Sequence, residues 1–179
     1  LLVGVFKPTV NYGSELEINK PVEEAWAVMM DESKMADWLI GYKSAELLSG
    51  TKNEVGAVSK IIMHPPGEEM MEMKETITAM KENEHLGMKF EMDLASSTLD
   101  MYFEEKNGKT IMRSKAAATG GNIFMKSMLA MMSSQMRQQD EEIMNNLKKV
   151  IEENTTDYFP APVSEATSTE ENLSTENQH

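Results

Sequence analysis

Six consecutive segments between residues 43 and 119 alternate apolar with polar residues and are separated by short turns. Residues 85–93 alternate most clearly, and their apolar face consists of Leu86, Met88, Phe90 and Met92. Asn107-Gly108, between two of the segments, is typical of a two-residue hairpin turn. Because short turns join neighbouring strands that run in opposite directions, the pattern predicts an antiparallel sheet. The expected strands cover residues 43–48, 57–64, 70–80, 85–93, 99–103 and 110–119.

A long amphipathic helix is expected after these strands. Gly120-Gly121-Asn122 interrupts the alternation, and helical spacing then continues to about residue 153. Its apolar positions are Met125, Met128, Leu129, Met132, Met136, Ile143, Leu147, Val150 and Ile151. A helix of this length is roughly 45 Å long at 1.5 Å per residue. It has one obvious place to lie, across the concave face of the sheet.

The segment before the first of these six strands predicts one strand and two short helices. Residues 12–18 alternate well enough for a strand, and Pro21 then suits the first position of a helix. A second short helix is expected from Ser33, as its capping residue, to Ile40. The predicted fold is therefore α+β: a curved antiparallel sheet of about seven strands wrapped on a long C-terminal helix, with two short helices after the first strand.

Composition excludes several classes of function. The formal charge of −13 argues against non-specific nucleic-acid binding, which needs clustered Lys and Arg. The absence of cysteine excludes disulfides, iron–sulfur clusters and thiolate zinc sites. His64, His85 and His179 have no ligand-spaced partners, and the chain has neither a Gly-x-Ser-x-Gly elbow nor a glycine-rich phosphate loop. The sequence predicts no catalytic constellation, no metal and no cofactor.

The two ends of the chain differ in composition from residues 10–159, which we expect to form the single folded domain. Residues 160–179 are rich in Ser, Thr and Glu and lack Lys and Arg, which predicts a disordered acidic tail. Residues 1–9 begin with six apolar or Gly residues and are interpreted as the remnant of an N-terminal membrane anchor or as an edge segment. With an anchor the protein is a membrane-anchored soluble domain; without one it is cytoplasmic.

The sequence resembles the SRPBCC superfamily, which includes START-like lipid-transfer domains, birch-pollen-allergen relatives and polyketide cyclase/dehydrase proteins. The resemblance covers roughly residues 12–153. It is carried by residues 16–26 (LEINKPVEEAW), Asp37-Trp38, residues 55–58 and residues 75–77. It implies a helix-grip fold with a hydrophobic cavity between sheet and helix, and some bacterial members carry a membrane anchor before the first strand. It does not imply one chemistry, because the members range from carriers to cyclases to co-chaperones.

The 18 methionines are the strongest functional indication, because flexible, polarizable Met side chains adapt to varied apolar partners. The alternative is that Met replaces Leu in a dry core. Glu75 would face inward with its apolar neighbours, so we expect Arg113 or a ligand to pair with it, unless a β-bulge exposes it to water. The predicted cavity-lining residues are Trp38, Met73, Glu75, Met88, Phe90, Met92, Met101, Phe103, Arg113, Met128, Met132 and Met136.

Three functions follow as hypotheses. The first is non-catalytic binding or transport of an apolar small molecule or lipid, with an apolar dye or a fatty acid expected to bind at micromolar concentration. The second is a polyketide cyclase/dehydrase-type enzyme that uses Glu75, Arg113 or Tyr102 as acid–base groups. The third is a chaperone-associated interaction domain. The sequence does not indicate an oligomeric state.

Overall fold

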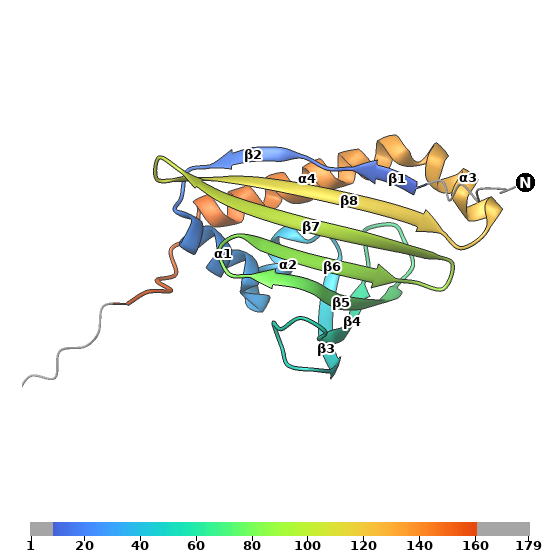
Figure 1. The fold of residues 1–179 in the computed structure, drawn as a ribbon, viewed down its shortest axis with the longest axis horizontal. Helices are drawn as coiled ribbons and strands as arrows, with labels where there is room; N and C mark the ends of the chain where they lie inside the picture. Colours follow the sequence, from blue (N-terminus) through green and yellow to red (C-terminus); the bar gives the residue numbers. More distant parts are fainter. Residues whose placement is uncertain (1–8, 161–179) are drawn as a thin grey trace, which may run out of the picture.

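The computed structural model describes residues 9–160, without the side chains of residues 123, 124 and 126. It has the predicted α+β architecture, in which one curved antiparallel sheet lies along a long C-terminal helix (Figure 1). The expectations for a tail at residues 160–179 and for an anchor or edge segment at residues 1–9 concern termini that lie almost wholly outside the described residues. Of the N-terminal segment only Thr9 is described, and it begins a strand.

All eight strands found within residues 9–160 belong to one sheet with antiparallel pairing throughout, in the order β1-β8-β7-β6-β5-β4-β3, and β2 also pairs with β8. The expected first strand is divided in two, because β1 and β2 pair with successive parts of β8 on either side of Gly13 and Ser14. The strands are β1 (Thr9–Tyr12), β2 (Glu15–Ile18), β3 (Tyr42–Ser49), β4 (Val58–Met63), β5 (Met71–Lys81), β6 (His85–Glu91), β7 (Ala95–Lys106) and β8 (Lys109–Gly120).

The predicted hairpin turn between β7 and β8 is confirmed. Asn107 and Gly108 have φ values of 54° and 73°, so both central residues occupy the left-handed region that a type I′ turn requires. This short turn lets β7 and β8 pair over their full lengths, from Lys106 opposite Lys109 to Ala95 opposite Gly120. The two longest strands thereby form the longest paired ladder of the sheet.

The helices are α1 (Val22–Met30), the 3₁₀ turn η1 (Glu32–Lys34), α2 (Met35–Trp38), α3 (Ile123–Met131) and α4 (Ser133–Glu152). The prediction that Ser33 caps the second helix is wrong, because the Asp31 carboxylate instead accepts a hydrogen bond from the Ser33 amide. The prediction of one uninterrupted C-terminal helix is also wrong in one respect. It is interrupted at Met132, whose φ and ψ of −87° and 3° depart from helical values.

Several of the completely buried residues of the core lie at the end of the molecule where α1 packs against α4. Leu147 and Ile151 of α4 are completely buried there, together with Ile18 of β2. The Trp26 and Phe103 rings meet edge to face, with centroids 5.4 Å apart, a favourable arrangement of two aromatic quadrupoles. This region, which we call the packed end, fixes α4 against the sheet.

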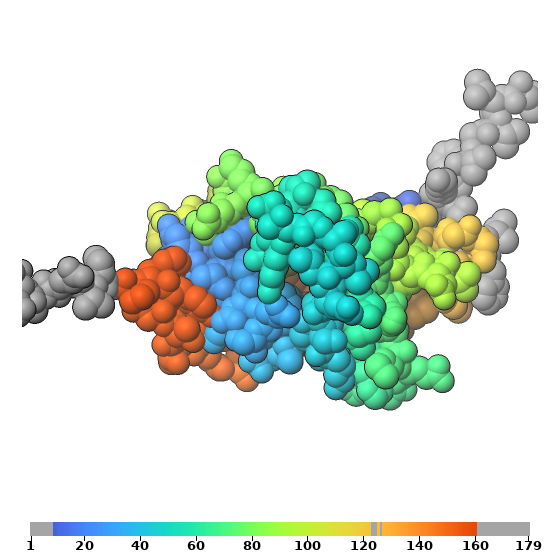
Figure 2. Space-filling model, turned by 90° about the horizontal axis from the view of Figure 1, so that it is seen from below, coloured from blue at the N-terminus to red at the C-terminus, as the bar shows by residue number. Residues whose placement is uncertain are grey.

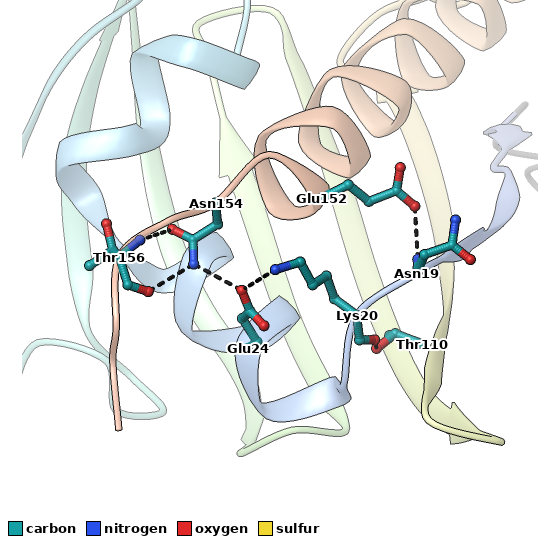
Figure 3. A network of polar contacts seen from close by, with 7 residues as sticks. All are labelled: Asn19, Lys20, Glu24, Thr110, Glu152, Asn154 and Thr156. Atoms are coloured by element: carbon teal, nitrogen blue, oxygen red, sulfur yellow. Dashed lines mark hydrogen bonds and ion pairs between the residues drawn. The ribbon is translucent and has the colours of Figure 1, made fainter. Parts of the chain in front are cut away.

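A network of polar contacts closes the packed end (Figure 3). The Asn154 side-chain amide donates hydrogen bonds to Glu24 Oε1 at 3.0 Å and to the Thr156 carbonyl at 2.9 Å. Lys20 Nζ forms an ion pair with the same Glu24 oxygen at 2.8 Å. The network joins the segment after α4 to α1, and in Figure 2 the orange-red end of the described chain lies against the blue segment.

A candidate ligand pocket between sheet and helix

A pocket of about 440 Å³ lies between the concave face of the sheet and the middle of α4. Its wall takes residues from β3 to β8, from α1 and α2, and from the loop after β3. Its volume falls within the range of roughly 300–1,000 Å³ that is usual for small-molecule sites. The loop between β3 and β4 and the segment containing α2 occupy the face shown in Figure 2, beside the pocket.

The wall is mainly apolar and rich in methionine. Nine of the chain's 18 methionines contribute to it: Met29, Met30, Met35, Met63, Met73, Met88, Met101, Met136 and Met144. They come from three helices (α1, α2 and α4) and four strands, so unbranched side chains surround the space from several directions. Such side chains change rotamer easily, and the wall can therefore adapt to ligands of different shape.

Seven of the twelve predicted cavity-lining residues lie in this wall: Trp38, Met73, Glu75, Met88, Phe90, Met101 and Met136. The structure brings these together from α2, the three strands β5, β6 and β7, and α4. Their contact with a ligand stays a prediction.

The other five predicted residues lie elsewhere. Phe103 packs against Trp26 in the packed end. Met92 lies beyond the end of β6 and is 40% exposed, and Met132, at the helix interruption, is 37% exposed. Met128 is half-buried on α3, outside the pocket wall. The alternating pattern of residues 85–93 continues two residues past the real strand end, which explains the error at Met92.

The expectation that Arg113 pairs with Glu75 is wrong, because Arg113 pairs with other residues on the other face of the sheet. It stands between the buried residues Met112 and Ser114, so strand alternation directs it to the outer face of the sheet. There its guanidinium pairs with Glu15 and, at 2.9 Å, with Glu104. Because successive side chains of a strand point to opposite faces of the sheet, the position of Arg113 in β8 excludes it from the pocket.

Glu75 projects into the pocket wall from the middle of β5, half-buried between its register neighbours Ser59 and Phe90. Among the described residues, no hydrogen bond or ion pair reaches its carboxyl group. Burial raises the pKa of this carboxyl, because the charged form loses hydration without gaining a partner. β5 shows no register shift at this residue, so no bulge turns Glu75 to solvent.

Tyr42 and an ion pair lie on the same part of the wall as Glu75. Desolvation, and then the charges of Glu32 and Glu75, raises the pKa of the Tyr42 phenol. Glu32 is joined to Lys52 by a short ion pair. Trp38 also lines the pocket, and its buried indole N–H has no acceptor among the described residues.

Asp140 of α4 and its hydrogen-bond partners Ser14 and Ser114 form a second polar cluster, on the helix side of the pocket. Its Oδ2 accepts hydrogen bonds from Ser14 Oγ at 2.7 Å and from Ser114 Oγ at 2.8 Å. Desolvation, and then the Asp140 charge, raises the pKa of nearby Tyr12. Sequence reasoning missed Asp140, although it lies four residues after Met136 and three before Ile143, on one face of the helix.

Within residues 9–160, no group of three or more His, Asp or Glu residues is arranged to hold a metal ion. In the same range, no helix is long and apolar enough to cross a membrane.

The sequence matches the family described as "Activator of Hsp90 ATPase homolog 1-like protein" over residues 19–152, about three quarters of the chain. The chain belongs to this family. The family is of the SRPBCC type, so the resemblance seen in the sequence is confirmed, and so is the helix-grip fold. Among curated proteins, none matches the sequence.

Solved structures share the fold of this family member at low sequence identity. Ara h 8.0201 is 12% identical with a TM-score of 0.62, over 82% of this chain and 99% of that one. A conserved protein from Geobacillus kaustophilus is 17% identical with a TM-score of 0.64, over 79% and 94%. The di-domain ARO/CYC StfQ from the steffimycin biosynthetic pathway is 11% identical with a TM-score of 0.65; the match covers 81% of this chain and only 52% of StfQ.

Proposed function

We propose that this domain binds, and carries, an apolar small molecule or lipid in the pocket between the sheet and α4, without performing chemistry on it. The observation that supports the proposal is the 440 Å³ space bounded largely by methionine and other apolar side chains. A dry core of the same composition would bring these side chains into mutual contact, because protein interiors are close-packed. Adaptable walls around a space of this size suit a ligand.

The positions of the candidate acid–base groups favour binding over catalysis. Tyr102 lies between the buried residues Met101 and Phe103, so it faces outward, where its ring stacks on His85 at 4.4 Å. Arg113 also faces outward. Of the three groups considered for a cyclase/dehydrase reaction, only Glu75 lies in the pocket wall, so the expected combination of Glu75 with Arg113 or Tyr102 does not converge on a substrate there.

Filling the pocket tests the proposal. Ala116 of β8 lines the pocket and is 7% exposed, whereas its neighbour Ala117 points to the other face of the sheet. Nile red, a neutral dye whose emission depends on polarity, should bind the wild type at micromolar Kd, about −8 kcal/mol. Ala116→Phe should weaken this binding at least tenfold, and Ala117→Phe should leave it unchanged. Equal effects of the two variants, with both folded by near-UV circular dichroism, would contradict the proposal.

A chaperone-associated role is the second candidate, because the family description refers to activation of the Hsp90 ATPase. It makes a different prediction for the same two variants. A protein that acts through its surface would stimulate a chaperone ATPase as well after Ala116→Phe as before, because Ala116 is buried.

A further inference from the structure

A site for a fatty acid needs a positive charge to neutralise the bound carboxylate, and the charges of this pocket wall are mainly negative. Apart from Tyr12 and Tyr42, the ionisable side chains that line the pocket are Glu32, Lys52, Glu75 and Asp140. Three are acids and one is a base. The base is already paired with Glu32, so among the described lining residues no cation is left to neutralise a bound anion.

The two remaining acids are in different situations. Asp140 receives two hydroxyl hydrogen bonds, from Ser14 and Ser114, which compensate much of its lost hydration. Glu75 receives none from any described residue. A buried carboxyl group without a partner is costly, and a ligand that supplies one recovers that cost on binding.

The chemistry of Glu75 determines which partner fits. A carboxylate accepts hydrogen bonds and attracts positive charge, so its strongest partner is an N–H donor that carries a positive charge. A second carboxylate would repel it in a site of low polarity. The neutral Trp38 N–H could hydrogen-bond an acceptor without compensating its charge. A fatty acid, which the methionine pattern alone allows, therefore fits the wall poorly.

On the basis of the proposed function, we infer that the pocket selects an apolar molecule bearing a protonated amine, whose N–H groups pair with Glu75 while its hydrocarbon part lies among the methionines. The pocket thus discriminates by head-group charge as well as by apolar area.

Three ten-carbon probes that differ only in head group test this selectivity. Decylamine, decanol and decanoate are each used to displace Nile red at pH 7 and 150 mM salt. Decylamine should bind at least tenfold more tightly than decanoate, with decanol between them. Glu75→Gln should weaken decylamine about tenfold, the loss of one charge-assisted hydrogen bond, and should change decanol little.

Glu72→Gln is the matched control, because Glu72 lies on the same strand but is exposed on the opposite face. Both variants lower the net negative charge by one, so they reduce non-specific attraction of an amine to the acidic chain equally. Decanoate binding as tightly as decylamine, or equal effects of the two variants on decylamine, would overturn the inference and leave the proposed function intact. If no probe displaces the dye and the dye does not bind, the proposed function itself fails.

Discussion

The C-terminal helices continue one amphipathic pattern, yet their two ends lie in different environments. Towards the end of α4, Met144 is 2% exposed and Leu147 and Ile151 are fully buried. At the junction of α3 and α4, Met131 is 81% exposed and Met132 37%. Between these regions, Met136 and Ile143 reach the pocket. The helices therefore pass from an exposed end, along a pocket, to the packed end.

A helical pattern of apolar residues therefore defines one face of a helix but not how deeply that face is buried. The burial of the apolar face depends on which elements pack against it. At the packed end α1 and β2 supply Trp26 and Ile18, and polar contacts from Asn154 close the structure. Along the middle of α4, the side chains from α2 and from the concave face of the sheet leave a space between them, and this space is the pocket. We assign stability mainly to the packed end and binding to the pocket, and the following predictions test that division.

The largest expected effect is the loss of packing at Leu147. Leu147→Ala should lower the free energy of unfolding by about 2–5 kcal/mol, because it leaves a cavity in a fully buried site. Met131→Ala, at a residue 81% exposed, should change it by less than about 0.5 kcal/mol. Urea denaturation followed by circular dichroism measures both. Similar losses for the two variants would contradict the division.

The next effect concerns the polar closure of the packed end. Asn154→Ala should cost about 1–2 kcal/mol, because it removes hydrogen bonds to Glu24 and Thr156 and leaves their groups without this partner. Asn145→Ala is the control, since Asn145 is exposed and, within the described part of the chain, its side-chain amide donates only to the Glu141 carbonyl of its own helix. If the two variants lose equal stability, the network does not hold the packed end together.

The smallest effect has the opposite sign. Glu75→Gln should stabilise the protein by about 1 kcal/mol at pH 7, because it removes a desolvated, unpaired charge. The raised pKa of Glu75 means that the folded state holds this proton more tightly than the unfolded state. Its contribution to stability is complete below the ordinary carboxyl pKa and is lost as pH rises through the folded pKa.

The advantage of Glu75→Gln over the wild type should therefore shrink as the pH falls from 7 to about 4. Glu72→Gln supplies the baseline, because no burial of comparable extent affects that exposed residue. Denaturation series for the three proteins at several pH values give the comparison. A gap between Glu75→Gln and wild type that stays constant with pH would show that Glu75 is not desolvated.

Much of the fold could be predicted from the sequence because local patterns report it directly. Alternation located the six strands from β3 to β8, and Asn107-Gly108 located their last turn. The division into β1 and β2 was missed, since it depends on how the chain pairs with β8 around Gly13. The Cβ of any residue at position 13 would meet the Ser114 carbonyl oxygen at 2.3 Å, so that close approach of two strands requires glycine.

The pocket was predictable only in part. The alternation of side chains along each strand correctly placed Met73, Met88 and Met101 on the inner face of the sheet. Applied to β8, the same alternation would have placed Arg113 on the outer face and excluded it from the predicted pocket. Met132 was misplaced because no proline or glycine signals the interruption of the helix there. Asp140 was missed because its two serine partners are distant in sequence, and only the folded chain brings them together.

The central claim, that the methionine-lined space is a binding site, is tested most directly by NMR of the protein with ¹³C-labelled methionine methyl groups, titrated with Nile red. Binding in the pocket predicts shifts at Met73, Met88, Met101 and Met136, which line it. It predicts little change at Met112, which is buried outside the pocket wall, and at exposed Met131. Shifts confined to Met131 and Met132, with the four pocket methionines unchanged, would show binding to the surface and would contradict the account.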